Sequence, residues 1–526
     1  MKTFLLIELL FIVCALYTGC FGQKVESDIN KRPNIIFIMS DDHAQRAISA
    51  YDSTLIQTPN IDRIANEGAL FTNSFVTNSI CAPSRAVMLT GKFSHVNGKK
   101  DNLDTFDGSQ QTFPKILQEN GYTTAVIGKW HLKSTPQGFD YYDILIGQGE
   151  YYQPRFVSER DTTVVEGYVT DIITDKAIEF IEGRKQGEPF CLLYHHKAPH
   201  RPWMPNVKDL GMYNNVDLPI PASFLDEYDG RIAAKEADMR IDDMYLSFDL
   251  KLHKRSYKEE TGTGGNANFK PERNWEATYA RLTPEQKRLW DAHYDTINDN
   301  FKQANLSDKA LSKWKLQRYL KDYLRCIKSV DDNICRLLEY LDATGLAKNT
   351  IVVYTSDQGF YLGEHGWFDK RFMYEQSMRT PLMVRYPNRI EAGTKVDKLV
   401  QNIDYAPTLL EYAGVDVPID MQGLSLTKVV AGKPIKDWRK ELYYHYYEYP
   451  DGWHSVKKHY GVRSDRYKLI HFYDDVDSWE LYDLLKDPDE INNLFNDRKY
   501  KRTQAQMMSA LRRLQQQYGD TITVNN

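Results

Sequence analysis

The chain has 526 residues and a formal net charge of −5 at pH 7. Its length predicts one large domain with a smaller one attached, and its slightly acidic balance argues against a nucleic-acid partner, so that any attraction for anions must be local. Aromatic residues make up 13% of the chain, including 35 tyrosines; most should pack in the core, although tyrosine-rich surfaces also suit the faces of sugars.

The first predicted element is an export signal at residues 1–22, where a basic start precedes an apolar run at 4–16 that is too short to span a bilayer. Simple cleavage would release this segment, whereas a lipobox-like sequence at 18–20 would make Cys20 a lipid-bearing N-terminus. Because Tyr17 is an unusual residue ahead of a lipobox, we favour simple cleavage. The protein is therefore expected to be exported, periplasmic or secreted, and to meet a membrane only as a surface lipoprotein.

A continuous apolar run at residues 33–40 predicts a strand buried on both faces of a parallel sheet. It ends in Asp41 and Asp42, and the carboxyl tips of such strands are where an open α/β sheet places its ligands. Two adjacent acids often mark only a solvated turn. The buried strand before them favours the alternative, a metal site.

The most informative stretch is Cys81-Ala82-Pro83-Ser84-Arg85, which follows a helix-start pattern at 58–65. Pro83 near the start of a short apolar stretch and Gly91 at its end predict a loop that enters a helix. Cys81 then lies at a helix N-terminus, where backbone N–H groups and the helix dipole favour negative charge. Taken alone, the pentapeptide would equally fit a loop with a buried cysteine.

A second strand tip carries basic residues. A short helix is expected at 113–121 and a buried strand at 122–127, which leads into Gly-Lys-Trp-His with Lys129 and His131.

A third strand, at 190–195, follows a predicted helix at 171–187 and runs into three histidines. Adjacent residues of a strand point to opposite faces, so the adjacent pair at 195–196 is expected to be structural. The third histidine, His200, follows in a Pro-His-x-Pro sequence.

The segment at 205–312 is polar and less periodic, which in an insertion of this length indicates either disorder or a lid. Its evenly spread aromatic residues favour an ordered excursion at the rim of a pocket. The Gly-rich stretch at 261–266 is expected to be a loop, because no strand precedes it.

A long helix at 314–341 leads to a strand at 350–355, which ends before Asp357 and Gln358 and so adds another tip with oxygen ligands. Lys370 follows in a loop. One more strand is expected at 381–385 and a helix at 404–412.

After residue 433 the pattern changes to alternating strands at 443–449, 459–470 and 479–483, with a turn at 463–466 and a closing helix at 503–518. Residues 434–526 therefore predict a small α+β domain with an antiparallel sheet.

These motifs together resemble the type I, formylglycine-dependent sulfatases, over about residues 31–518. The runs at 106–112 and 239–247 look like the polysaccharide sulfatase branch that includes N-acetylglucosamine-6-sulfatases. The resemblance implies an α/β fold with an alkaline-phosphatase-like mixed sheet sandwiched by helices at 31–433, and the C-terminal α+β subdomain.

The resemblance also implies the catalytic residues. Cys81 would be converted by a formylglycine-generating, sulfatase-maturing enzyme to 3-oxoalanine (formylglycine), whose hydrated aldehyde is the nucleophile. Arg85 would hold this hydrate in place. Positive charge near the sulfate would come from the two lysines, and the two histidines would move protons. The positions that match the family motifs are Cys81, Arg85, Lys129, His131, His200 and Lys370.

The expected metal ligands are Asp41, Asp42, Asp357, Gln358 and one oxygen of the converted Cys81. Hard oxygen ligands suit Ca²⁺ or Mg²⁺, and a cage built mostly from side chains favours Ca²⁺. Many relatives have asparagine or histidine where this chain has Gln358.

The function implied is hydrolysis of sulfate esters in a polysaccharide or its oligosaccharides: a glycosaminoglycan, a mucin, or an algal polysaccharide such as ulvan or carrageenan. The alternatives are a phosphonate monoester or phosphodiester hydrolase of the same superfamily, and an inactive sugar-binding relative. The single clear metal site and the filled catalytic positions favour the sulfatase. His445, His454 and the aromatic residues of the insertion are our candidates for contacts with sugar.

Overall fold

The computed structural model describes residues 32–252 and 269–520 except 388 and 434, and the chain from residue 33 onward forms one compact unit. The expected signal segment and the Gly-rich loop at 261–266 lie outside the described residues. Among the described helices, none is both long enough and apolar enough to cross a bilayer.

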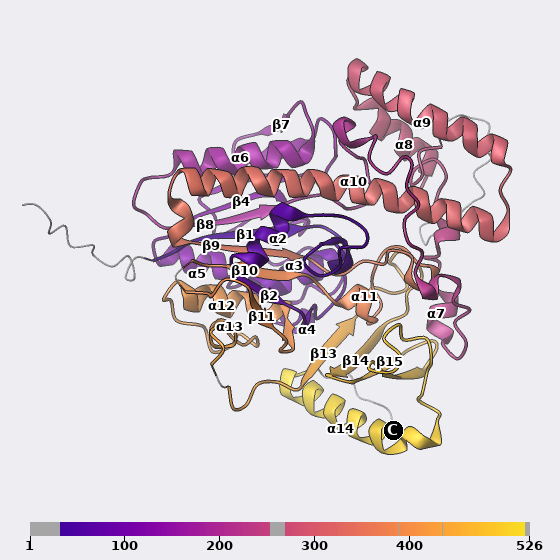
Figure 1. Cartoon of the computed structure of the whole chain (residues 1–526). Coiled ribbons are helices and arrows are strands. Elements are labelled where there is room, and N and C mark those ends of the chain that lie inside the picture. Colours follow the sequence, from indigo (N-terminus) through magenta and orange to yellow (C-terminus); the bar gives the residue numbers. More distant parts are fainter. Residues whose placement is uncertain (1–31, 253–268, 388, 434, 521–526) are drawn as a thin grey trace, which may run out of the picture. The chain divides into compact units, whose positions relative to one another are not determined.

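A ten-stranded mixed sheet forms the centre of the fold (Figure 1). Its middle strands are β1 Asn34–Ser40, β4 Thr123–Lys129, β5 Tyr141–Leu145, β8 Phe190–His195 and β9 Thr350–Ser356. They lie in the order β9-β1-β8-β4-β5 and all run parallel, as their continuous apolar runs predict. Their carboxyl ends therefore meet at one edge of the sheet.

Short strands extend this sheet on both sides, and most of them were not expected from the sequence. They are β2 Ala69–Phe71, β10 Leu382–Arg385 and β11 Thr394–Val396 on one side, and β6 Arg155–Ser158 and β7 Thr162–Val164 on the other. A separate pair is formed by β3 Ser74–Phe75 and β12 Val400–Gln401.

Helices cover both faces of the sheet because β1 sends alternate side chains to opposite sides. Ile36 and Ile38 belong to one core and Ile35, Phe37 and Met39 to the other. The first core contains α2 Pro59–Asn66, α6 Val169–Gly183 and α10 Asp308–Ala343, and the second contains α3 Cys81–Thr90, α5 Phe113–Glu119 and α12 Tyr405–Tyr412 (Figure 1).

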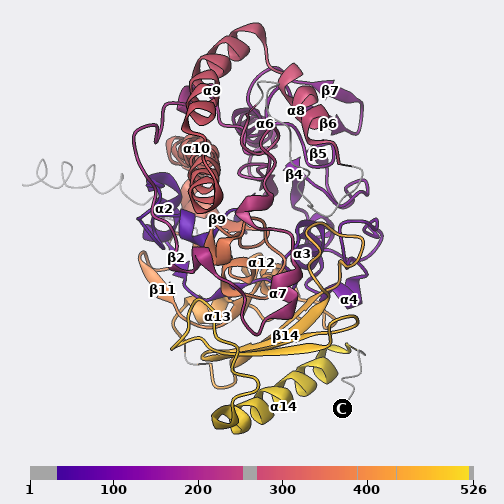
Figure 2. The ribbon, with the colours of Figure 1, turned by 90° about the vertical axis from the view of Figure 1, so that its right-hand side faces the viewer.

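A four-stranded antiparallel sheet follows near the C-terminus: β13 Glu441–Tyr446, β14 His459–Ser464, β15 Tyr467–Phe472 and β16 Ser478–Asp483. Its strands pair in chain order, with the expected turn between β14 and β15. Helix α14 Lys501–Tyr518 packs on one face of this sheet (Figure 2). The fold class expected from the sequence is thereby confirmed.

The insertion at 205–312 contains α7 Ile232–Glu236, α8 Pro271–Ala280 and α9 Pro284–Ala304 in its described part. Trp275, Trp290 and Tyr294 are buried in the first core beside α10. The burial of these three residues argues against the expected contact with sugar, because their rings pack α8 and α9 against the domain. The remaining short helices are α4 Ser94–Asn97, α11 Glu375–Met378 and α13 Thr427–Val430.

Candidate active site

The predicted site residues converge because the parallel strands end together. In the register of the sheet, Met39 of β1 lies beside His195 of β8, and Ser40 lies beside Ser356 of β9. The residues that follow these strands must therefore share the same edge of the sheet. This explains why Asp41 and Asp357, more than 300 positions apart, are neighbours.

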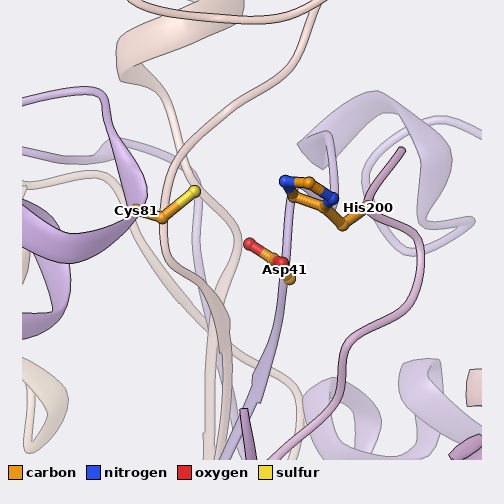
Figure 3. A group of neighbouring side chains, drawn as sticks. All are labelled: Asp41, Cys81 and His200. Atoms are coloured by element: carbon orange, nitrogen blue, oxygen red, sulfur yellow. The ribbon is translucent and has the colours of Figure 1, made fainter. Parts of the chain in front are cut away.

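Cys81 is the first residue of α3 and points at this edge from the side of the second core. Ligand atoms of Cys81, Asp41 and His200 all lie within 4.8 Å of one another (Figure 3). Burial raises the pKa of the Cys81 thiol, an effect that the nearby Lys370 only partly offsets. An unmodified cysteine here would therefore remain a neutral thiol and a poor nucleophile at neutral pH.

Three buried carboxylates form the acidic part of the site. Oxygen atoms of Asp41, Asp42 and Asp357 lie within 4.8 Å of one another. Burial raises the pKa of Asp42 to about 7 and that of Asp357 to about 6. Burial also opposes ionisation of Asp41, but Lys129 and Arg85 hold its pKa well below the usual range. The protein thus leaves two of the three carboxyls short of positive charge.

This cluster fits a divalent cation. Asp41 Oδ1 and Gln358 Oε1 are buried oxygens without a hydrogen-bond partner among the described residues, and buried polar atoms are normally paired. The Gln358 side chain contacts Asp42 Oδ1 through Nε2, and exchanging its amide nitrogen and oxygen would turn the oxygen toward the cluster. Carboxylate and amide oxygens are the ligands that Ca²⁺ and Mg²⁺ prefer.

Three buried cations face the carboxylates. Lys129 contacts Asp41, and Lys370 contacts Asp42 with its Nζ also 3.4 Å from Cys81 Sγ. Arg85 donates from Nε and Nη2 to Asp357 Oδ2 at 3.0 and 2.9 Å. Although burial disfavours the charge, Asp42 holds the pKa of Lys370 well above its usual range, so this side chain stays an ammonium.

The histidines divide as the sequence suggested. His200 Nδ1 lies 2.7 Å from the Arg201 carbonyl and so carries the hydrogen, while Nε2 faces Asp42 Oδ2 at 3.7 Å. Burial and then Lys129 hold the pKa of His200 well below its usual range. His131 follows β4 in a left-handed conformation with φ of 58°, and its Nδ1 has no partner among the described residues.

His195 and His196 are fully enclosed in the protein. His195 Nδ1 lies 3.1 Å from the Lys129 carbonyl, where it supports the end of β4.

A second polar group beside Lys370 was missed by the sequence analysis. Arg371 donates to Asp369 Oδ1 at 2.9 Å and to Glu448 Oε1 at 2.7 Å. The other oxygen of Glu448 accepts from the backbone N–H of Asn102 at 2.7 Å. His454 lies next to this group, with Nε2 3.5 Å from Asp369 Oδ2. The run Asp-Lys-Arg at 369–371 was the one available signal.

Asn102 also contacts helix α3, because its Oδ1 accepts from the Ala82 N–H at 3.1 Å. One backbone donor in the first turn of α3 is therefore satisfied by a loop that Glu448 holds in place. A residue near the end of β13 thus supports the position of Cys81 through two hydrogen bonds.

His445 does not join the site. Its Nδ1 lies 2.7 Å from Asp520 Oδ2 and its Nε2 2.9 Å from the Tyr473 hydroxyl, and the residue is 1% exposed. Both ring nitrogens are taken by protein partners, which argues against a contact with sugar. The physical reason is strand alternation: in β13, His445 shares the face of Tyr443, which packs toward α14.

Comparison with known proteins gives concordant results. A family model described as Sulfatase matches residues 33–415, and one described as N-sulphoglucosamine sulphohydrolase, C-terminal, matches residues 363–517. The chain is 52% identical over 505 residues to an N-acetylglucosamine-6-O-sulfatase of Bacteroides thetaiotaomicron, covering 95% of this chain and 88% of that protein. It is 25% identical over 457 residues to human N-acetylglucosamine-6-sulfatase, covering 81% and 70%.

Among solved structures, one of a protein in complex with its substrate D-glucosamine-2-N,6-O-disulfate matches with a TM-score of 0.89 and 52% identity, covering 94% of this chain and 99% of that chain.

Proposed function

We propose that this chain, which belongs to the sulfatase family and is a sulfuric ester hydrolase acting on sulfated sugars, removes the 6-O-sulfate group from glucosamine residues. The observation that carries the proposal is the 52% identity to an N-acetylglucosamine-6-O-sulfatase along nearly the whole chain. A solved structure of a protein that is also 52% identical to this chain contains D-glucosamine-2-N,6-O-disulfate as its substrate, which supports a 6-O-sulfated glucosamine as the substrate here. A glycosaminoglycan or mucin is thus favoured over an algal polysaccharide.

We infer that Asp41, Asp42, Asp357 and Gln358 hold the metal ion, and that it is Ca²⁺ because the donors are almost all side-chain oxygens. When bound, such an ion supplies positive charge that stabilises the oxygens of the sulfate group. Lys129 and Lys370 supply further fixed charge in a water-poor site, where it acts strongly on developing negative charge.

We infer that Cys81 is converted to formylglycine by a maturing enzyme, which supplies an oxygen nucleophile at this position. The raised pKa of the thiol supports the conversion, since the cysteine itself would not ionise. Lys370 Nζ, 3.4 Å from Sγ, is placed to orient a group attached at residue 81. Arg85 fixes Asp357 and, through Nη1, the carbonyl of Lys129 at 2.8 Å.

His200 is our candidate for the proton donor to the leaving sugar oxygen. Its Nε2 is the ring nitrogen that faces the acidic cluster, and its Nδ1 is anchored to the Arg201 carbonyl. The free site keeps this ring neutral, and the arrival of an anionic sulfate raises the pKa of a nearby histidine. His200 would then take up its proton together with the substrate. His131, whose Nδ1 has no hydrogen-bond partner in the described part of the chain, is our candidate for the base of the second half-reaction.

On the sugar side, Asp369, Arg371 and His454 form the polar wall nearest to Lys370. We infer that Asp369 and Arg371 contact hydroxyl groups of the sugar that carries the sulfate. His454, which we expected to bind substrate, is 1% exposed with Nδ1 2.8 Å from the Asp238 carbonyl, so we infer that it orients Asp369 instead.

The deciding experiment is a desulfation assay of the protein produced with a sulfatase-maturing enzyme. We expect sulfate release from 6-O-sulfated glucosamine units, with little from carrageenan or ulvan oligosaccharides or from an aryl phosphodiester. A Cys81→Ala variant is the matched inactive control. Mass spectrometry of the peptide that carries residue 81 should show the aldehyde; an intact thiol in fully active protein, or faster phosphodiester turnover, would contradict the proposal.

Export is likewise a proposal that rests on residues 1–22 alone. Mass spectrometry of the mature N-terminus from the native host distinguishes simple cleavage from a lipid on Cys20.

A further inference from the structure

Lys129 has a second partner that neither the sequence motifs nor the proposed mechanism uses. Its ammonium carries three N–H donors. One is directed at Asp41 Oδ2, and another at the side-chain oxygen of Gln148 at 2.5 Å. With two donors fixed by the protein, the direction of the third is set as well.

The backbone around Gln148 is shaped for this contact. In the register of the sheet, Lys129 of β4 lies beside Leu145 of β5, and the chain turns three residues later. Gly147 and Gly149 flank Gln148 with φ of 57° and 72°, in the left-handed region that favours glycine. A side chain at Gly149 would also come within 2.7 Å of Leu145. The turn is closed by a hydrogen bond from the Gly149 N–H to the Ile146 carbonyl at 2.9 Å.

The chemistry of a carboxamide matters here. Asp41 already balances one positive charge of Lys129. A second carboxylate at position 148 could accept the same hydrogen bond, but it would cancel the charge that the lysine offers to an anion. Glutamine supplies the acceptor geometry and leaves that charge intact.

We propose that Gln148 is a positioning residue that directs the third N–H of Lys129 at an oxygen of the bound sulfate group while preserving the lysine's charge. This proposal rests on the proposed function, because it assumes that Lys129 binds sulfate.

The test compares two substitutions of equal length, Gln148→Glu and Gln148→Met. The first keeps the acceptor and adds a negative charge, and the second removes the acceptor. Gln137→Glu is the matched control, since Gln137 also accepts from a lysine, Lys115 at 3.3 Å, on the exposed surface. For each variant, kcat and KM on a sulfated glucosamine substrate, the affinity for inorganic sulfate by calorimetry, and the melting temperature are measured.

We expect Gln148→Glu to lower kcat/KM and the affinity for inorganic sulfate by roughly tenfold or more, which corresponds to about 1.4 kcal/mol. Gln148→Met should lower both by about threefold to tenfold, while the control stays within about twofold of the wild type. All three variants should melt close to the wild type, because Gln148 sits in a surface turn.

Wild-type sulfate affinity in Gln148→Glu would overturn the proposal, whatever its activity. Equal losses in both variants, together with a lowered melting temperature that the control lacks, would assign Gln148 a structural role and also overturn it. A wild type that binds inorganic sulfate but hydrolyses no sulfate ester would instead refute the proposed function, and the calorimetric comparison would still test Gln148.

Discussion

Arg85 offers the sharpest test of what holds the site together. Its side chain is 2% exposed, and it joins two strand ends, through Asp357 Oδ2 beyond β9 and the Lys129 carbonyl at the end of β4. The motif that contains Arg85 suggested a role against the converted Cys81. Its contacts with Asp357 and Lys129 show that it also supports the structure, so we expect its loss to weaken the fold in addition to catalysis.

The expected size follows from burial. Arg85→Met removes three hydrogen bonds and leaves Asp357 buried without its main counter-charge. Breaking a buried ion pair from one side costs about 3 to 5 kcal/mol, and we expect the free energy of unfolding to fall by that amount. Asp357→Asn alone should also destabilise. The double variant should lose less than the sum of the two, by about 2 to 3 kcal/mol, because either change already removes the shared interaction.

Urea unfolding followed by tryptophan fluorescence, with all four proteins in one metal-free buffer, measures this cycle. The control is the exposed pair Arg288 and Glu285, in which Nε and Nη2 donate to the two carboxylate oxygens at 2.9 and 2.7 Å and the side chains are 66% and 65% exposed. We expect no measurable coupling there, because solvent screens the two charges. A buried coupling no larger than this surface value would refute the reasoning.

Three further outcomes are expected. Burial raises the pKa of Glu480 to about 7, so the folded protein keeps this carboxyl protonated at pH values where the unfolded chain ionises it, and the free energy of unfolding falls by about 3 kcal/mol as the pH rises from about 4.5 to 7. Glu480→Gln should remove this pH-dependent loss. A stability difference between variant and wild type that does not vary with pH in urea titrations would contradict this expectation. Glu448→Gln places an amide N–H against a donor, either Arg371 or the Asn102 backbone, and should lower the free energy of unfolding by about 1 to 3 kcal/mol. It should also raise KM for a sugar sulfate more than for an aryl sulfate. Equal effects on both substrates would argue against a contact between the polar wall and the sugar. In Gly128→Ala, the new Cβ would lie 2.0 Å from the His195 carbonyl oxygen, so the free energy of unfolding should fall by more than about 3 kcal/mol. Gly98→Ala has a φ of 80° but open space around it in the described part of the chain, so the same quantity should fall by only about 1 kcal/mol. Similar melting temperatures for the two variants would disprove the steric explanation.

The centre of the fold could be predicted because its strands are buried on both faces. The apolar runs at 33–40, 190–195 and 350–355 are continuous, which is typical of parallel strands. Once these strands are parallel, the polar residues after each one must meet at a single edge. The acidic cluster, Lys129 and His200 followed from this rule and from the motifs that the chain shares with its family.

Residues that act through turns could not be predicted in the same way. Gln148, Asn102 and Glu448 belong to three separate loops, and nothing in their local sequence marks which distant side chain they meet. The prediction for His445 failed for a related reason. Alternation in β13 shows that His445 and Tyr446 face opposite sides of the sheet. Which of these sides lies toward the site depends on the packing of α14 against one face and of residues such as Phe372 and Tyr374 against the other.

The balance of buried charge explains why the site can be specific for an anion in an acidic protein. Asp41, Asp42 and Asp357 bring three formal negative charges, and Arg85, Lys129 and Lys370 bring three positive ones. These six groups therefore balance in formal charge, and the pKa values of two of the carboxyls remain raised. A divalent cation on the carboxylate oxygens would give the site a net positive charge close to where the sulfate must sit. The neutral carboxamides of Gln148 and Gln358 fit this balance, because each contributes an oxygen without adding negative charge.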